Sequence, residues 1–220
     1  MEKYLRIGKE HLKFNLLPHL FLAVVLLCIS PLLMGVENLD AYRTARVLEM
    51  YVAIIGIILL LPVCIPEQNA NILDLVRTKA TSYTMVIVIR ILVAAISLAI
   101  LIGIYVLILR ENQCTFPVLK YYLGTFAQAF FLGSMGLFSY LIFNRIAVAY
   151  MLPTMYYISC FGSGKNLLKN FYLFSMSYGE YKQKWYLFVG GLTFILLGIA
   201  FLLLFQKLKA YVIRIKIDRA

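Results

Sequence analysis

Six long stretches of the sequence contain no Asp, Glu, Lys or Arg, and this feature restricts the fold more than any other. Each stretch has 17 to 24 residues, and together they hold 124 of the 220 residues. A helix needs about 20 apolar residues to cross the roughly 30 Å hydrocarbon core of a bilayer. The sequence therefore predicts an all-α membrane protein with six transmembrane helices, over residues 14–36, 47–66, 84–109, 118–144, 146–162 and 185–206.

The connections between these predicted spans leave no room for a soluble catalytic domain. The longest connection, about Gly162–Lys184, has some twenty residues. Only 14 % of the residues are charged, whereas soluble domains contain about 25 %. We therefore expect one transmembrane domain over residues 1–220, with no enzymatic activity of its own.

The net charge of +11 is best explained by membrane topology. Basic residues that flank spans are retained on the cytoplasmic side. If the N-terminus is inside, the inner segments hold 12 Lys and Arg and the outer segments hold 8. The count places both termini in the cytoplasm, and the chain offers no basic and aromatic platform for binding nucleic acid.

Two further absences narrow the classes of function. The four cysteines form no CxxC pair and have no metal-ligand spacing, so we expect no metal site and no cofactor on this chain. No Asp or Glu is expected deep in a span, whereas proton-coupled carriers use intramembrane carboxylates. Ion-driven transport is therefore disfavoured.

Several short segments outside the spans have their own character. Residues 1–13 place apolar side chains on one helical face, which predicts an interfacial helix. Residues 67–82, between the second and third spans, combine apolar residues with charges of both signs, which favours an amphipathic helix that docks on a protein. Residues 163–184 mix polar and apolar residues and predict short helices at the outer face.

Arg90 is a charge within the third predicted span. A charged side chain in a span is costly unless it reaches the interface or a partner. Its guanidinium could extend to the cytoplasmic headgroups, or it could pair with Glu67 or Asp74.

The fourth predicted span carries a stripe of small residues, which suits close helix packing. A tight turn at Asn144-Arg145 joins it to the fifth span, and Gly190-Gly191 forms a packing notch in the sixth.

This arrangement resembles the six-span permease subunits of the type-2 ATP-binding-cassette (ABC) exporters. In that family the segment after the second span reads as a glutamate, then Gly-Thr-Leu-Glu-Leu-Leu and a serine, with a basic residue in the third span. The matching residues here are Glu67, Leu73, Asp74, Leu75, Val76, Thr78 and Arg90. Asn71 and Ile72 stand where the family has Gly-Thr; an Asn can replace a Gly at positive φ, but Ile72 departs from the pattern.

The resemblance implies a coupling helix over residues 67–82, which contacts a separate ATPase subunit. The residues implied in that contact are Glu67, Asn71, Leu73, Asp74, Leu75, Arg77 and Thr78. ATP and Mg²⁺ would bind the ATPase subunit, and a second permease subunit, identical or homologous, would complete a dimer. Residues 163–184 would form an extracellular gate region.

The 16 Tyr and 15 Phe favour a hydrophobic or amphipathic cargo, such as a peptide, drug or lipid-like molecule. The candidate substrate path includes Tyr140, Tyr150, Tyr156 and Tyr157. The abundance of Ile, Lys, Tyr and Asn is typical of an AT-rich bacterial genome and places the chain in a bacterial cytoplasmic membrane, in contact with lipid. Two alternatives stay open: an ATP-independent secondary transporter or channel, and a non-transporting immunity or sensory protein.

Overall fold

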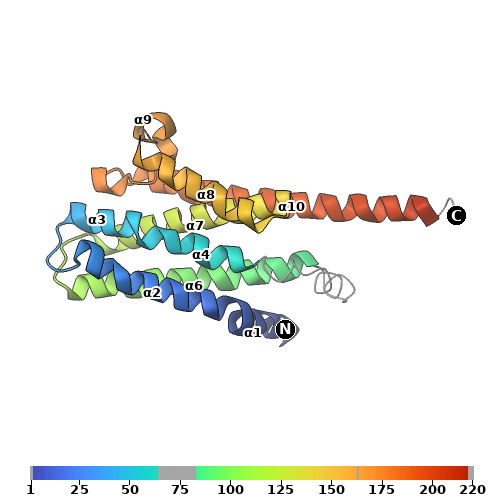
Figure 1. Ribbon diagram of the computed structural model, residues 1–220, viewed down its shortest axis with the longest axis horizontal. Coiled ribbons are helices and arrows are strands. Elements are labelled where there is room, and N and C mark those ends of the chain that lie inside the picture. Colours follow the sequence, from blue (N-terminus) through green and yellow to red (C-terminus); the bar gives the residue numbers. More distant parts are fainter. Residues whose placement is uncertain (1, 64–82, 163, 218–220) are drawn as a thin grey trace.

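The computed structural model describes residues 2–63, 83–162 and 164–217, and every regular element in these ranges is a helix (Figure 1). The long elements are α2 (Leu17–Met34), α6 (Tyr83–Glu111), α7 (Val118–Phe143), α8 (Ile146–Phe161) and α10 (Lys182–Ile217). The short helices are α1 (Glu2–His11), α3 (Ala41–Met50), α4 (Ile55–Leu60) and α9 (Gly164–Leu168). One π-helical turn, η1 (Leu12–Leu16), and three 3₁₀ turns, η2 (Val52–Ile54), η4 (Lys169–Phe171) and η5 (Met176–Tyr178), join them.

Five helical segments of the described residues are long and apolar enough to cross a membrane. They are Arg6–Met34, Ala41–Val63, Tyr83–Glu111, Val118–Phe143 and Lys182–Leu204. The prediction of a helical, multi-pass membrane protein is confirmed at this level. The remaining predicted span, 146–162, is a helix of 16 residues, which is shorter than the roughly 20 residues of a perpendicular crossing.

The long helices run up and down between two ends of the molecule (Figure 1). The N-terminus, the end of α4, the start of α6 and the C-terminus lie towards the same end, which we call the proximal end. The connections from α2 to α3 and from α6 to α7, together with α9, lie at the opposite, distal end. There, the Asn38 amide donates to the Asn112 carbonyl at 3.0 Å and the Thr115 amide donates to the Leu39 carbonyl at 3.1 Å, so the first two distal connections are tied together.

The bundle is built around two of the membrane-spanning candidates, Ala41–Val63 and Val118–Phe143. In their most apolar stretches 72 % and 67 % of the residues are buried, against 22 % in the stretches of α2 and α10. The outer helices expose rows of large apolar side chains, for example Leu92, Ile96 and Ile100 on α6. A surface of this composition suits contact with lipid or with another apolar chain rather than with water.

Glycines set the distance between the two central helices. A Cβ on Gly56 of α4 would lie 1.9 Å from the Ala129 carbonyl oxygen of α7, and a Cβ on Gly133 would lie 2.5 Å from the Gly56 carbonyl oxygen. The two backbones are therefore in direct contact. Gly136 plays the same part against α8, since its Cβ would lie 2.8 Å from the Ala149 carbonyl oxygen. The predicted stripe of small residues on α7 is therefore confirmed. The predicted notch at Gly190-Gly191 is also confirmed, because added Cβ atoms would meet Phe131 and Phe130 there.

The chain reverses sharply between α7 and α8. Asn144 ends α7 in the left-handed conformation, with φ of 50°, and its amide donates to the Tyr140 carbonyl at 2.7 Å. Asn tolerates this conformation better than most residues. The predicted tight turn at Asn144-Arg145 is confirmed.

The N-terminal segment is helical and continuous with the first long segment. The backbone stays helical from α1 through the π turn into α2. Gly8 of α1 lies against Val93 and Ile89 of α6, so α1 packs on the proximal half of that helix. The predicted interfacial helix over residues 1–13 is thus a helix, and its relation to a bilayer stays a prediction.

The close contact between α4 and α7 gives a direct test. Gly56→Ala places a methyl group against a backbone carbonyl that cannot rotate away, so we expect a loss of at least about 3 kcal/mol of stability, at the upper end of overpacking costs. The matched control is Gly103→Ala on α6, where the new Cβ makes an ordinary 3.5 Å contact with Tyr122. It should leave stability unchanged or raise it by up to about 1 kcal/mol, because Ala favours helix over Gly.

Thermal unfolding of the detergent-solubilised protein, followed by circular dichroism, measures both variants. Equal melting temperatures for Gly56→Ala and Gly103→Ala would contradict the backbone contact.

Candidate functional site: a buried ion pair at the distal end

Glu49 is a fully buried acidic residue inside a helix long enough to cross a membrane. Glu49 lies in the last turn of α3 (Ala41–Met50), whose N-cap residue is Asp40. The Asp40 carboxylate caps the helix by accepting from the Arg43 amide at 3.1 Å. The relative exposure of Glu49 is 0 %. The expectation that no Asp or Glu lies deep in a span is therefore wrong, because the charge-free stretch starts one residue after Glu49 whereas the helical segment starts at Ala41.

Lys184 pairs with this carboxylate. It lies in the first turn of α10, and its Nζ atom is 2.7 Å from Glu49 Oε1. The same ammonium group donates to Gln128 Oε1 at 2.7 Å and to the Leu173 carbonyl oxygen. An ammonium group has three donors, and each of them has an acceptor here.

The carboxylate also binds the backbone of the distal segment, which we define as residues 169–181. Glu49 Oε1 accepts from the Met176 amide at 2.7 Å, and Oε2 accepts from the Ser177 amide at 3.2 Å. These two amides begin η5, where the helix has no carbonyl partner for them. One side chain of α3 therefore fixes both the start of this turn and the Lys184 charge.

Gln128 of α7 completes the cluster and bends the neighbouring helix. Its Nε2 atom donates to the Glu49 carbonyl at 2.9 Å, and the Tyr157 hydroxyl donates to the Met50 carbonyl at 2.5 Å. Two side chains thus occupy acceptors that a continuous α-helix would use internally. The Ile54 amide bonds instead to the Tyr51 carbonyl, and the chain turns through η2 before α4 begins.

Close packing buries the cluster. A Cβ on Gly124 would lie 2.4 Å from Met176 Sδ and 3.3 Å from Lys184 Cγ, so only glycine allows α7 to approach so closely here. Leu173, Phe174 and Met176 of the distal segment are buried among the helix ends. Burial raises the pKa of the neighbouring Tyr172 to about 12, so its hydroxyl stays neutral at physiological pH.

The geometry suits fixation rather than catalysis. Each charge is buried, paired and hydrogen-bonded, which is the condition under which buried charges are tolerated. The cluster joins α3, α7 and α10 to the distal segment.

The predicted coupling residues lie outside the described residues. This holds for Glu67, Asn71, Leu73, Asp74, Leu75, Arg77 and Thr78, and their role stays a prediction.

Arg90 lies at the proximal end of α6 and is 8 % exposed. Its Nη1 atom donates to the Val63 carbonyl at 3.2 Å. The guanidinium is therefore held inside the bundle near the end of the second long segment, and does not extend outward as the headgroup interpretation expected. Its predicted partners Glu67 and Asp74 lie outside the described residues.

The four tyrosines of the candidate substrate path have separate surroundings. The Tyr156 hydroxyl donates to the Phe171 carbonyl at 2.7 Å, and the Tyr157 hydroxyl to Met50, so both tie α8 to distal elements. Tyr140 is buried near the proximal end of α7, and Tyr150 is half-buried on α8. The path itself stays a prediction.

Glu49, Lys184 and Gln128 were not among the predicted site residues. A usable signal existed for the two charges. Glu49 directly precedes the second charge-free stretch and Lys184 directly precedes the sixth. In the predicted topology both stretches begin at the outer face, so opposite charges enter the bundle at a similar depth. Gln128 lies in the middle of an apolar stretch and carries no such signal.

Comparison with known proteins found no match. The chain matches no protein-family model, and neither the curated proteins nor the solved structures include a match.

The ion pair makes a prediction that separates it from a surface contact. Glu49→Gln and Lys184→Met each leave a buried charge without its partner, so each should cost about 3–5 kcal/mol and lower the melting temperature by about 10 °C. The double variant removes both charges and should recover most of this loss. Thermal unfolding in mild detergent measures all three.

The matched control is the exposed pair of Lys165 and Glu180, whose atoms lie 3.7 Å apart. Glu180→Gln should cost less than about 1 kcal/mol. If the double variant at positions 49 and 184 lost as much stability as the two single variants together, the two charges would not be coupled, and this would contradict the ion pair.

Proposed function

We propose that this chain is the membrane-spanning permease subunit of a type-2 ABC exporter. It works as a dimer with a second permease subunit, identical or homologous, and beside separate ATPase subunits that bind ATP and Mg²⁺. Its cargo is a hydrophobic or amphipathic molecule that leaves a bacterial cell across the cytoplasmic membrane. The chain itself carries no catalytic step.

The observation that carries this proposal is the position of the connection between α4 and α6. That connection leaves Val63 and re-enters at Tyr83 at the proximal end, where both termini also lie (Figure 1). It holds the sequence that resembles the coupling segment of the family, from Glu67 to Thr78. The described ends of this connection, Val63 and Tyr83, lie at the same end as the N-terminal helix and the C-terminal part of α10, and an ATPase that docks at this end would be close to all of them.

The proposal includes six membrane crossings, with α8 as the fifth. α8 has 16 residues, or about 24 Å of helix, and it packs along α7 after the reversal at Asn144. It returns the chain to the distal end, where α9 lies and α10 begins (Figure 1). With both termini in the cytoplasm, the distal end is extracellular.

In this proposal the distal segment belongs to the extracellular gate region of residues 163–184. Glu49 and Lys184 hold it against the helix ends in the described conformation. Export then requires either that cargo passes beside this fixed segment, along faces that carry Tyr140, Tyr150, Tyr156 and Tyr157, or that the segment moves together with α3 and α10.

An ATP-independent carrier is the second candidate, and Glu49 is the observation in its favour. Ion-coupled carriers use buried carboxylates, and Glu49 is buried in a helix of membrane-spanning length. However, both of its oxygens already accept backbone or ammonium donors. Transport by the purified chain in vesicles under an ion gradient alone would favour this candidate over the exporter.

Co-purification directly tests the proposal that this chain is part of an ABC exporter. The tagged chain, extracted from its native membrane in mild detergent, should bring down a partner that hydrolyses ATP. Asp74→Lys and Arg77→Glu should each reduce the recovered ATPase activity several-fold, because they reverse charges on the docking segment. Each variant should still insert into the membrane in normal amount.

The matched controls reverse the same charges at the distal end. Glu111→Lys and Arg110→Glu alter exposed residues at the end of α6, and should leave the recovered ATPase activity unchanged. Failure to recover any ATP-hydrolysing partner with the unaltered chain would refute the exporter. Equal recovery with all four variants would refute the coupling segment.

A further inference from the structure

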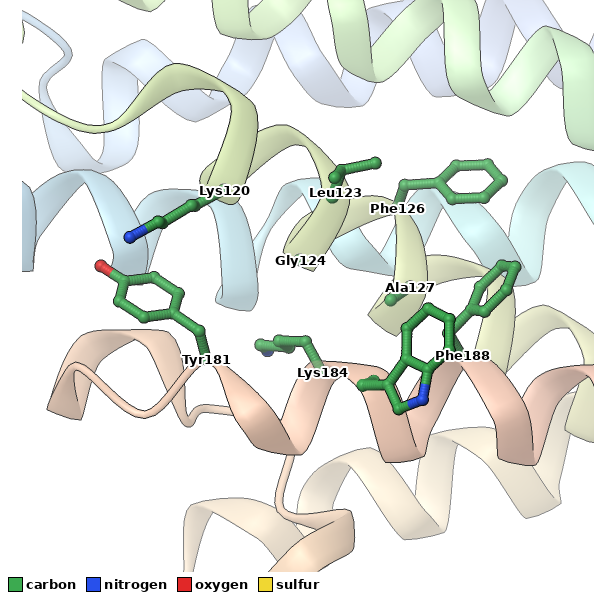
Figure 2. A pocket seen from close by; sticks show the side chains of 9 residues that line it. Lys120, Leu123, Gly124, Phe126, Ala127, Tyr181, Lys184 and Phe188 are labelled. Atoms are coloured by element: carbon green, nitrogen blue, oxygen red, sulfur yellow. The ribbon is translucent and has the colours of Figure 1, made fainter.

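A cavity of about 440 Å³ lies between α7 and α10 at the distal end (Figure 2). Figure 2 shows the side chains of Lys120 and Tyr181 close together at one end of it, and those of Phe126 and Phe188 at the other. The cavity therefore has a polar mouth and an apolar interior. Its volume falls within the range of small-molecule sites, about 300–1,000 Å³.

A second cavity of about 280 Å³ continues from the apolar end. It lies between α6, α7 and α10, and it shares Phe126 and Phe188 with the first cavity. The rings of Phe126, Phe130 and Phe188 lie 5.8 to 6.5 Å apart and form the common wall. The two cavities adjoin at these rings, and we call the two together the distal groove.

One face of α10 lines this groove along its whole length. Trp185, Phe188, Leu192, Ile195 and Ile199 recur every three or four positions, as one side of a helix requires, and Lys184 lines the groove directly before Trp185. From Lys184 to Ile199 the helix rises about 22 Å. Half of the hydrocarbon core of a bilayer is about 15 Å thick, so the groove is long enough for one acyl chain of a single leaflet.

The polar mouth carries an available positive charge. The Lys120 side chain is exposed, and its Nζ atom lies 5.5 Å from the centre of the Tyr181 ring. In the part of the chain that the structure describes, no carboxylate forms an ion pair with Lys120. Lys184 also lines the cavity, but its ammonium group is occupied by Glu49, Gln128 and Leu173.

We propose that the distal groove binds one anionic glycerophospholipid, with its phosphate at Lys120 and Tyr181 and one acyl chain between α6, α7 and α10. The ammonium and the phenolic hydroxyl match a phosphate, and the apolar wall beyond them matches a hydrocarbon chain. The exposed ring of Trp185 lies beside Phe188, with the two ring centres 5.9 Å apart, so it lines the apolar part of the groove that the acyl chain would occupy. This site does not depend on the exporter proposal, because the lipid can bind the chain without any ATPase.

Trp185 is the only tryptophan of the chain and therefore reports on the groove directly. The full-length protein is placed in phosphatidylcholine vesicles that contain a minor fraction of phosphatidylglycerol. In one series, only the acyl chains of phosphatidylglycerol are brominated near the headgroup. In the other series, an equal fraction of the phosphatidylcholine carries the same brominated chains instead. Bromine quenches tryptophan fluorescence on contact, so the two series compare occupancy at Trp185.

We expect brominated phosphatidylglycerol to be preferred by about fivefold, which corresponds to one lysine contact near a membrane surface. Lys120→Gln should abolish the preference. Lys182→Gln, which removes an exposed charge next to Tyr181 that does not line the groove, should retain it. Equal loss in both variants would overturn the site, because a general surface attraction would then explain the preference.

A second pair of variants tests the acyl-chain part. Ala95→Phe fills the groove from α6, and Ile96→Phe adds a ring on the adjacent exposed face. The preference should fall in Ala95→Phe and persist in Ile96→Phe. Equal quenching by the two lipids in the unaltered protein would refute the proposal. Stronger quenching by a brominated free fatty acid than by phosphatidylglycerol would also refute it, since the occupant would then be a fatty acid.

Discussion

The ion pair between Glu49 and Lys184 is the interaction on which the distal half of the structure depends. A buried carboxylate without partners is strongly unfavourable, and here three elements are arranged around it. α10 supplies the ammonium group, the distal segment supplies two amides, and Gln128 of α7 binds the backbone beside it. Gly124 allows α7 to come close to Met176 and Lys184, and the break after α3 lies where Gln128 and Tyr157 bind two helical carbonyls.

This arrangement gives the two ends of the bundle different properties. The distal end is fixed by charge pairing and by tyrosine hydroxyls that bind carbonyls, and the contact of glycine with backbone at the α4–α7 crossing fixes the middle of the bundle. The proximal end carries α1, the end of α4, the start of α6 and the C-terminal part of α10. An exporter that is driven from the proximal side would therefore move helices against a distal end that resists rearrangement. A lipid in the distal groove would add an apolar contact between α6 and α10, whose direct contact is slight.

The sequence predicted the helical membrane architecture well, because charge-free stretches of 17 to 24 residues have few other uses. It also predicted the reversal at Asn144 and the close packing of α7, since Asn and Gly have distinct backbone and steric properties. It missed the length of the second segment and the burial of Glu49. The reason is physical: a charge that is paired inside a bundle appears in the sequence as the end of an apolar stretch, although its helix continues. The break within that segment depends on Gln128 and Tyr157, which lie 79 and 107 residues away from the carbonyls that they bind, and no local pattern encodes it.

Hydrogen exchange at the Met176 and Ser177 amides tests the central role of the ion pair most directly. Both amides should exchange slowly in the intact protein, because they donate to a buried carboxylate. In Glu49→Gln/Lys184→Met, exchange should accelerate in the distal segment alone, while the α4–α7 crossing stays protected. If these two amides of the unaltered protein exchanged as fast as those of an exposed loop, the central role of the ion pair would be contradicted.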